Sequence, residues 1–561
     1  MFALWSSLIL IAVAFLVLSP LFMLLMNSFE TNKLGQAVQI GTDNWWRVFT
    51  GARLGEALVN TVSLSFARQS IGMAVGVSIA WLIARTNLPY RNLLEIGFWV
   101  ALFMPALPVT LSWVLLAAGR SGLLNQLAMQ LPFVDKPIFE VYSWWGIVWV
   151  HLMTSSIAIK VFLLTPALRS LDSSMEEAAR ASGASLIGTL TRIVIPIMAP
   201  VLVVVFLISM VRSMQAFEVE LILGAPKQIS VYSTVIFSAM TREPPAQGLA
   251  SALSIVFIAS IIPLVILQQW FVSRHSYASI SSKFRNRTLD LGRWRWPAFA
   301  AISSLLALMT VVPFVLLIIS TFMSMFGVFG ADDAWTLDNW DRALFGGEIS
   351  QALSNTLQLS VGASLTGMAA FSLIAYITAK RDFAGRHVLD FCTWLPTLIP
   401  GLVLSLGLLQ VFTFFPFLRP LYGSMAVLII AVLMGTMTIG TQMVKTAMGQ
   451  VGRELEEAAW VSGGSRFYTF RRIILPLIAP SVAVVGLEIF ATANAAVGII
   501  VLLGTGATQP LSVLQLTLLD SGRFEQASVI GVIITTLTVS AAILARTIGQ
   551  RAGLGHEAAT A

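Results

Sequence analysis

The sequence predicts an all-α membrane protein with about twelve transmembrane helices arranged as two parallel six-helix repeats. Composition is the first observation: 57% of the 561 residues are hydrophobic, only 11% are charged, and mean hydropathy is +0.84. Soluble globular proteins carry about 25% charged residues. The second observation is that apolar runs long enough to cross a bilayer recur along the whole chain. The third is that one polar to amphipathic segment occurs twice, once in each half, which indicates an internal duplication.

Apolar runs of at least about 18 residues mark the candidate spans. In the first half they lie near 4–28, 57–84, 93–118, 143–168, 197–223 and 249–272. In the second half they lie near 298–323, 352–379, 388–415, 421–447, 478–503 and 526–549. We expect the first run to be a retained span, because it is longer than a signal-peptide core and no A-x-A site follows it.

Two further matches relate the halves. ALVNTVSLS at 57–65 is similar to ALSNTLQLS at 352–360, and the pair Trp99 and Pro105 returns as Trp394 and Pro400. An even number of spans precedes each copy, so the two copies have the same orientation in the membrane. We therefore divide the chain into a first half at 1–272, a basic cytoplasmic linker at 273–297, and a second half at 298–561.

The repeated segment is the most informative part of the sequence. It reads EEAARASGASLIGTLTRIVIPIMAP at 176–200 and EEAAWVSGGSRFYTFRRIILPLIAP at 456–480, within loops at 170–196 and 450–476. Each copy predicts a short helix with small residues on one face, ended by a glycine. Ser173, three residues before Glu176, predicts the start of the first helix. The matched positions are Glu176, Glu177, Ala178, Ala179 and Gly183 in the first copy and Glu456, Glu457, Ala458, Ala459 and Gly463 in the second.

Most of the 34 Lys and Arg residues fall on the side of the predicted membrane that holds both repeated loops. The positive-inside rule therefore places both loops and both chain termini in the cytoplasm. An interfacial helix lying on the bilayer is the alternative interpretation of such a loop. Two copies with the same small residues and glycine on the same side favour a surface that docks a soluble partner.

The spacing of these residues, E-A-A-x-x-x-G-x(9)-I-x-L-P, resembles the EAA loop of the membrane subunits of binding-protein-dependent ABC importers. The first copy has Ile195 where that family usually has Leu. The fused size is similar to that of permeases of the ferric iron, thiamine and 2-aminoethylphosphonate group. The resemblance implies a type I ABC importer fold, in which the matched residues of each copy form a helix that docks on an ATPase subunit.

The same resemblance implies the partners and the transported solute. Two copies of an ABC ATPase would bind the loops, and a periplasmic substrate-binding protein would deliver a small solute to this permease in the bacterial inner membrane. Iron(III) is the first expectation, with 2-aminoethylphosphonate, thiamine and polyamine as alternatives. No G-x-x-x-x-G-K-[ST] motif occurs in the sequence, so ATP and Mg would be bound by the partner. The chain itself is expected to be non-catalytic, to bind no cofactor or metal, and to have no nucleic-acid partner.

Charged residues inside predicted spans are candidates for a substrate path, because such residues usually face a bundle interior or a water-filled route. Internal ion pairs and long side chains that reach an interface are the alternatives. Glycines in spans, such as Gly72, Gly76, Gly362 and Gly367, are expected to allow close helix packing. The path candidates are Arg68, Lys160, Arg212, Glu218 and Glu488, with Glu220 beside them in sequence.

Two rival classes remain open at this stage. A secondary transporter also commonly has two six-span halves, but it needs no duplicated docking loop. A membrane scaffold that only holds an ATPase would not require charges within its spans. The four histidines have no metal-ligand spacing, and the single cysteine, Cys392, excludes an intrachain disulfide.

Overall fold

The computed structural model describes residues 2–31, 39–171, 174–274, 288–329, 333–380 and 383–551. Within these residues ten helices are long and apolar enough to cross a membrane, or up to twelve if each of two bent helix pairs counts as one span. The predicted all-α membrane fold is confirmed. An antiparallel pair of two-residue strands, β1 (Glu30–Thr31) and β2 (Gln39–Ile40), joins the first span to the next helix.

Two of the twelve predicted spans are not continuous helices. In the first half, Arg91–Leu102 and Ala106–Ala117 meet at 98°, and in the second, Arg386–Leu398 and Gly401–Phe414 meet at 114°. Pro105 and Pro400 lie at these breaks with extended backbone, at ψ 139° and 141°. Proline lacks the N–H that a continuous helix needs and disfavours helical geometry in the residue before it. The unbroken helices predicted at 93–118 and 388–415 were therefore wrong.

Two other spans begin and end earlier than predicted. The runs at 197–223 and 478–503 correspond to spans at Ile187–Met214 and Phe470–Ala495. Each helix extends back into the repeated loop because the loop itself is helical up to the start of the span. The first helix stops three residues before a short separate helix at Glu218–Gly224, and the second stops before a series of turns that is itself apolar, so hydropathy alone did not locate the ends.

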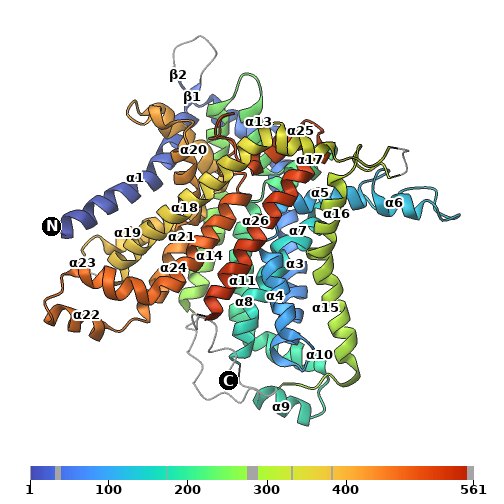
Figure 1. The fold of residues 1–561 in the computed structure, drawn as a ribbon, viewed down its shortest axis with the longest axis horizontal. Helices are drawn as coiled ribbons and strands as arrows, with labels where there is room; N and C mark the ends of the chain where they lie inside the picture. Colours follow the sequence, from blue (N-terminus) through green and yellow to red (C-terminus); the bar gives the residue numbers. More distant parts are fainter. Residues whose placement is uncertain are drawn as a thin grey trace. The chain divides into compact units, whose positions relative to one another are not determined.

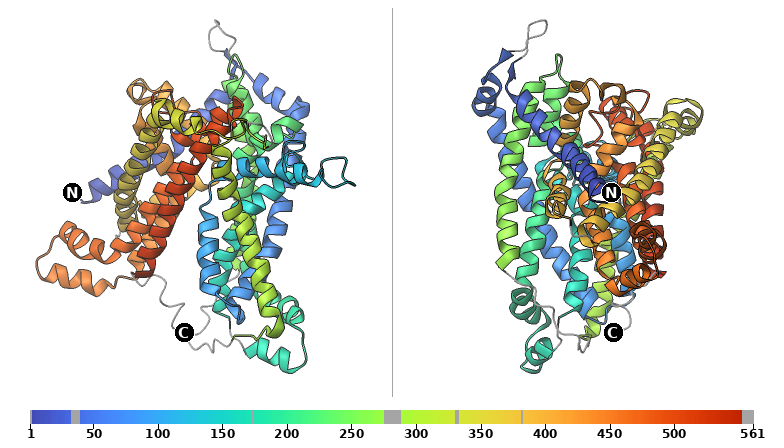
Figure 2. Two further views of the ribbon diagram at one scale, coloured as in Figure 1. Left: turned by 45° about the vertical axis from the view of Figure 1, so that its right-hand side comes forward. Right: turned by 90° about the vertical axis from the view of Figure 1, so that its left-hand side faces the viewer.

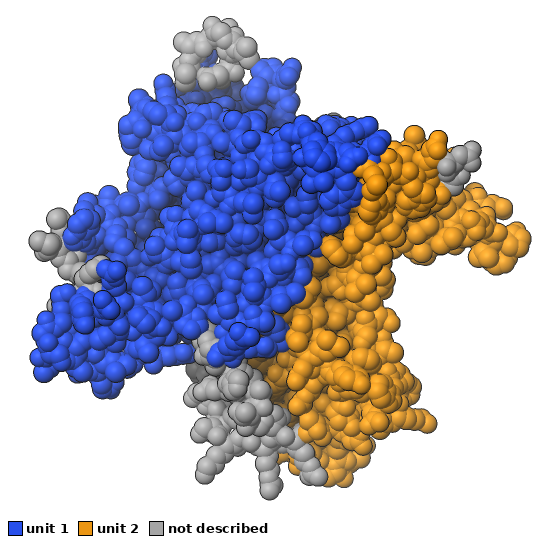
Figure 3. All heavy atoms as spheres, viewed as in Figure 1, with its two compact units in different colours: residues 1–54, 233–258, 338–555 blue, residues 55–232, 259–337, 556–561 orange. Residues whose placement is uncertain are grey.

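Packing between helices defines two compact units, shown in different colours in Figure 3. Unit 1 comprises residues 1–54, 233–258 and 338–555, and unit 2 comprises residues 55–232, 259–337 and 556–561. These units are not the contiguous halves 1–272 and 298–561. The halves follow the sequence repeat. Unit 1 instead contains the first span of the first half with the later spans of the second half, and unit 2 contains the first span of the second half with most of the later spans of the first half. Residues 275–287 of the predicted linker lie outside the described residues.

In unit 1, α18 packs against α21 and α24, and α24 packs against α26 (Figure 1). The helix α1 lies along α20 and α19, with Phe15 and Phe415 ring centroids 5.8 Å apart. A Cβ built on Gly407 of α20 would lie 2.7 Å from Cβ of Pro20, so the close packing of α1 requires a glycine at this position.

The helices of unit 1 are α1 (Phe2–Ser28), α2 (Asp43–Thr50), α13 (Tyr232–Thr241), the start of α14 (Gln247–Arg274), α17 (Asp338–Phe345), α18 (Glu348–Lys380), α19 (Arg386–Trp394), η5 (Leu395–Leu398), α20 (Gly401–Phe414), η6 (Arg419–Leu421), α21 (Met425–Gly449), α22 (Arg453–Val461), α23 (Arg466–Thr469), η7 (Phe470–Ile474), α24 (Leu475–Ala495), α25 (Leu511–Asp520) and α26 (Phe524–Arg551).

In unit 2, α16 packs against α5 and α15 against α4. A Cβ on Gly97 of α4 would approach Cγ of Leu306 to 3.1 Å, and Ser112 Oγ donates to the carbonyl oxygen of Pro313 at 2.7 Å. The first span of the second half is thus built into this unit. The helices are α3 (Ala52–Arg85), α4 (Arg91–Leu102), α5 (Ala106–Ala117), α6 (Leu123–Ala128), α7 (Trp144–His151), η1 (Leu152–Ser156), α8 (Ile157–Arg169), α9 (Ser174–Ala181), α10 (Leu186–Thr189), η2 (Leu190–Val194), α11 (Ile195–Met214), α12 (Glu218–Gly224), η3 (Ala225–Lys227), the end of α14, η4 (Gly292–Trp294), α15 (Arg295–Met309) and α16 (Val311–Thr321).

Candidate functional site

The two repeated loops have the same conformation. Figures 1 and 2 show α9 with α10, and α22 with α23, as pairs of short helices at the ends of long helices. Both α9 and α22 end at a glycine with positive φ, +85° at Gly183 and +82° at Gly463. The N–H of Ala184 donates to the carbonyl oxygen of Ala179 at 3.0 Å, and the N–H of Gly464 donates to that of Ala459 at 2.9 Å. This is the Schellman pattern of a glycine-terminated helix, so the predicted role of both glycines as helix ends is confirmed.

The loops also match where they join their spans. A five-residue π-helical turn occurs at the same place in both, as η2 at Leu190–Val194 and η7 at Phe470–Ile474. Each turn leads directly into a helix whose second residue is a proline, Pro196 or Pro476. Because π-helical turns are rare, their coincidence shows that the sequence repeat is also a structural repeat.

Exposure divides the matched loop residues into two groups. Glu176 and Glu456 are buried, at 2% and 3% of their possible exposure, so neither side chain lies on the exposed surface of its loop. Ala459 is buried, and Glu177 and Ala179 are partly buried. The residues that face solvent are Ala178, Gly183, Glu457, Ala458 and Gly463.

Large apolar side chains surround these exposed small residues, a feature that the sequence analysis only partly anticipated. On α9 and at α10, Met175 and Ile187 are exposed. On α22 and α23, Leu455, Val461 and Tyr468 are exposed. Apolar side chains grouped on a surface rimmed by charges are typical of a protein interaction site. The outer face of each loop is therefore suited to contact another protein.

Burial of Glu176 has a specific cause. Its Oε2 accepts from Nη2 of Arg85 at 2.8 Å and from Nε of Arg85 at 3.0 Å, and both side chains are almost completely buried. Arg85 is the last residue of α3. The sequence analysis did not single out Arg85, because nothing local links it to a glutamate 91 positions further along the chain.

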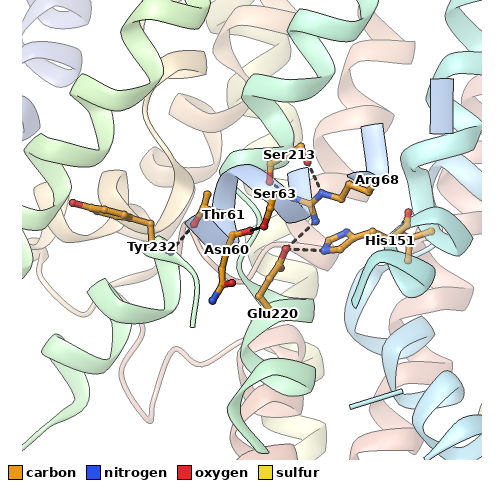
Figure 4. Close-up of polar contacts among 9 residues, drawn as sticks. Asn60, Thr61, Ser63, Arg68, His151, Ser213, Glu220 and Tyr232 are labelled. Carbon is orange, nitrogen blue, oxygen red and sulfur yellow. Dashed lines mark hydrogen bonds and ion pairs between the residues drawn. The ribbon is translucent and has the colours of Figure 1, made fainter. Parts of the chain in front are cut away.

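A buried polar cluster joins four helices of unit 2 (Figure 4). Arg68 of α3 contacts Glu220 of α12 through Nη1 and Oε1 at 2.8 Å, and His151 of α7 contacts the same oxygen through Nε2 at 2.9 Å. Arg68 also donates to the hydroxyl and the carbonyl oxygen of Ser213 on α11. Arg68 and Glu220 are each about 2% exposed. This geometry is that of the internal ion pair that the sequence analysis left open, and it includes a histidine that the sequence analysis had set aside.

Lys160 is completely buried and donates to the side-chain oxygen of Gln69 on α3. Glycines on α3 make room for it, because a Cβ built on Gly76 would lie 2.5 Å from Lys160 Cβ, and one on Gly72 would lie 3.3 Å from the Ser156 carbonyl oxygen. The predicted role of these glycines in close helix packing is confirmed. Among the other path candidates, Arg212 is exposed, whereas Glu218 and Glu488 are partly buried.

The matched positions of the second half carry no charge. The two halves match at an offset of 295 residues up to Pro105 and Pro400, and at an offset of 280 residues in the repeated loops. At these offsets Arg68, His151, Lys160 and Glu220 correspond to Ala363, Ala431, Gly440 and Ile500. Where the second and fourth spans of each half cross, one span carries a glycine and the other a large side chain, and the two halves place the glycine on opposite spans. The first half pairs Gly76 with Lys160, whereas the second pairs Phe371 with Gly440, whose added Cβ would lie 2.7 Å from Phe371 Cε2. Sequence reasoning could have found this exchange only by aligning the two halves position by position.

The exchange leads to a stability prediction. Gly76→Phe alone is expected to lower the free energy of unfolding by at least about 1–3 kcal/mol, because the site is already filled by Lys160. Adding Lys160→Gly, which reproduces the arrangement of the second half, should recover part of this loss. Thermal unfolding of the purified protein in detergent measures both effects. Gly55→Phe is the control on the same helix, since nothing lies within 4 Å of a Cβ added at Gly55. Equal unfolding midpoints for Gly76→Phe and Gly55→Phe would contradict the prediction.

A duplicated set of apolar helices with two matched, exposed loops defines a polytopic membrane protein built from an internal repeat. Residues 72–277 and 368–553 each match the family model of the binding-protein-dependent transport system inner membrane component. The two matches together cover more than half of the chain, which therefore belongs to this family.

Two individual permeases are similar to most of this chain. The chain is 27% identical over 454 residues to a probable ABC transporter permease, y4fN, of Sinorhizobium fredii, covering 77% of this chain and 76% of that one. It is 28% identical over 437 residues to the ferric transport system permease FbpB of Actinobacillus pleuropneumoniae, covering 76% of this chain and 61% of the relative. It is also similar to a crystal structure of a bacterial alginate ABC transporter, at 18% identity and a TM-score of 0.41, over 49% of this chain and 94% of that one.

The family defines the role of the chain in general terms. It is a multi-pass inner-membrane permease subunit of a binding-protein-dependent ABC importer, and permease subunits of this kind are not catalytic. The prediction from the repeated loops is confirmed at this level. A binding protein and an ATPase are its implied partners. The secondary-transporter and scaffold alternatives are not favoured by any of these relatives.

Proposed function

We propose that this chain forms the transmembrane route of an ATP-driven importer of iron(III) delivered by a periplasmic binding protein. The observation that carries the ATP-driven part is the duplicated loop, with small residues and apolar side chains exposed on the outer face of α9 and α22. Support for iron comes from three ferric transport permeases that are 24–28% identical to this chain over 76–82% of its length.

Other solutes have weaker support. A spermidine and putrescine permease, PotB of Escherichia coli, is 24% identical over 46% of this chain. A sulfate permease, CysT of Salmonella typhimurium, is 26% identical over 43%. Thiamine and 2-aminoethylphosphonate, the other solutes suggested by the resemblance, have the sequence pattern alone in their favour. Iron(III) is therefore the solute to test first.

In this proposal each loop docks one copy of a separate ATPase subunit, which binds ATP and Mg. Glu177, Ala178, Ala179 and Gly183 belong to one docking helix, and Glu457, Ala458, Ala459 and Gly463 to the other. Glu176 and Glu456 would support these helices from within. Both chain termini would lie in the cytoplasm, on the side of the loops, as the basic residues suggest.

The substrate path is also a proposal. Complete burial and internal pairing support a structural role for Arg68 and Lys160. Arg212, Glu218 and Glu488 are less buried, and we keep them as candidates to contact the solute. Neutralising each of them and measuring the concentration dependence of uptake separates the two roles, because a path residue changes the apparent affinity for the solute.

Uptake by the complete transporter tests the proposed function. Vesicles that contain this permease and its ATPase, supplied with the cognate binding protein, are expected to accumulate radiolabelled iron(III) only when ATP is present. Polyamine, thiamine, 2-aminoethylphosphonate and sulfate should not compete. Competition by one of these solutes would indicate that it, and not iron(III), is the transported solute. Uptake by the permease without any ATPase would overturn the ATP-driven mechanism itself.

A further inference from the structure

The end of α3 is bound tightly to the first docking helix through one side chain. The guanidinium of Arg85 donates twice to Oε2 of Glu176 on α9, at 2.8 and 3.0 Å, and its Nη1 donates to the carbonyl oxygen of Leu171 at 3.0 Å. It therefore contacts both α9 and the segment that precedes α9. The second oxygen of Glu176, Oε1, is buried without a hydrogen bond, so within the described part of the chain Arg85 is the partner that holds this carboxylate.

Among the described residues, the main helix contacts of α9 lie within its own loop. It is a helix of eight residues that packs chiefly against α10 and η2, which belong to the same loop. Met175, Ala178 and Arg180 are exposed. A buried ion pair is strongly destabilising to break, because removing one partner leaves the other charge buried and unpaired. The Arg85–Glu176 pair is therefore the contact best suited to make α9 and α3 move together.

The end of α3 is itself held in place by the described C-terminal part of the linker, residues 288–297. The N–H of Leu289 donates to the carbonyl oxygen of Arg85 at 2.7 Å, and the Asn87 side chain donates to Asp290 at 2.6 Å. Leu289 is buried in a core cluster with Trp81 of α3. The N–H of Gly292 and the Asn87 amide lower the pKa of the Asp290 carboxyl, which keeps this hydrogen-bonded partner ionised. Arg85 thus projects from a well-anchored helix end.

The sequence repeat places a basic residue and a glutamate at the matched positions of the second half. The offset of 295 places Lys380 at the position of Arg85, at the end of α18. The offset of 280 places the buried Glu456 at the position of Glu176. The side chain of Lys380 lies outside the described ones, so the contact is described for the first half only. A cation and a buried glutamate at both matched positions are nevertheless what a repeated structural link requires.

We propose that Arg85 is a positioning residue for energy coupling, which transmits displacement of the docking helix α9 to the second span through Glu176. The proposal rests on the proposed function, since it assumes that α9 contacts the ATPase. The helix α3 is continuous from Arg85 to Arg68, and at 1.5 Å per residue it carries a displacement about 25 Å to the buried cluster. Arg85 and Glu176 act behind the docking surface, because both side chains are buried.

The test uses the complete transporter in vesicles and measures three quantities: ATPase subunit retained on the permease, ATP hydrolysed, and iron(III) taken up. Arg85→Gln and Glu176→Gln are expected to retain the ATPase while the ATP hydrolysed per iron transported rises roughly tenfold, within the range of coupling between sites. Arg85→Lys keeps the charge but cannot make all three contacts at once, so its ratio should be intermediate. Arg91→Gln, an exposed arginine at the start of the next helix, is the control and should keep the wild-type ratio.

The three quantities separate the possible failures. The coupling role would be overturned if the ATP hydrolysed per iron transported is unchanged in Arg85→Lys and Glu176→Gln, including the case in which hydrolysis and uptake both fall in proportion. Loss of the ATPase subunit from these variants would overturn it in favour of a docking role. If Arg85→Gln does not accumulate in the membrane, Arg85→Lys and Glu176→Gln still decide the question. Failure of the wild-type permease to retain any ATPase would instead contradict the proposed function.

Discussion

Ala458→Arg is expected to abolish retention of the ATPase subunit by this permease. Ala458 is exposed on α22 between the exposed apolar side chains Leu455 and Val461. A long, charged side chain there would prevent close approach of a partner surface and would have to lose its hydration on docking. A loss of at least about 1.4 kcal/mol, or tenfold in affinity, is expected. Co-purification of the ATPase with the permease, and binding measured with the purified proteins, check this result.

The choice of alanine matters for this experiment. Ala459 is buried, and its carbonyl oxygen accepts the hydrogen bond that ends the helix, so Ala459→Arg would disrupt the loop itself. Ala458→Ser is the matched control, because it keeps a small side chain on the same surface. Ala178→Arg repeats the test in the first loop. Normal ATPase retention by Ala458→Arg and Ala178→Arg would mean that these faces do not dock the ATPase.

Arg68→Ala is expected to destabilise the protein by about 3–5 kcal/mol, the usual effect of removing one partner of a buried ion pair. Both Arg68 and Glu220 are about 2% exposed, so solvent cannot compensate the carboxylate that remains. His151 would be its remaining contact from the cluster. Thermal unfolding in detergent measures the loss. An unfolding midpoint equal to that of the wild type would show that the pair contributes no stability.

A double variant separates stability from transport. Replacing both charges by uncharged side chains of similar size, as Arg68→Met with Glu220→Gln, should restore most of the stability lost in Arg68→Ala, since no buried charge is left unpaired. Uptake kinetics of this stable variant then decide between the two roles. Wild-type kinetics would assign the pair to structure alone, whereas altered kinetics would return Arg68 to the substrate path.

The loops were the part of the candidate site that the sequence predicted best. A helix ended by Gly183 or Gly463 depends on the few residues around each glycine, and both glycines adopt the expected positive φ. Their pattern was also sufficient to identify the family. Which loop residues face outward was predicted less well. Glu176 and Glu456 are as polar as their exposed neighbours, yet both are buried, and burial depends on partners elsewhere in the chain.

The bends in the third span of each half had a local signal that hydropathy did not use. Pro105 and Pro400 occupy matched positions, and proline restricts the backbone of both itself and the residue before it. No local sequence signal predicted that the first span of each half would pack in the compact unit that holds the later spans of the other half. The helix α1 is apolar over its whole length, so its sequence does not specify which face packs or against what.

The sequence by itself determined the helices, the duplication, the two glycine-ended loops and the family, because hydrophobic periodicity and helix termination depend on residues near one another in the chain. Which side chains and helices contact one another was decided by the tertiary structure alone. Arg68 contacts Glu220, which lies 152 positions away in sequence, and Arg85 contacts Glu176, which lies 91 positions away. The helix α1 can pack closely at Gly407 because that residue has no side chain. Such contacts depend on how helices cross and on the space that each glycine leaves, and neither is determined by the residues adjacent in sequence.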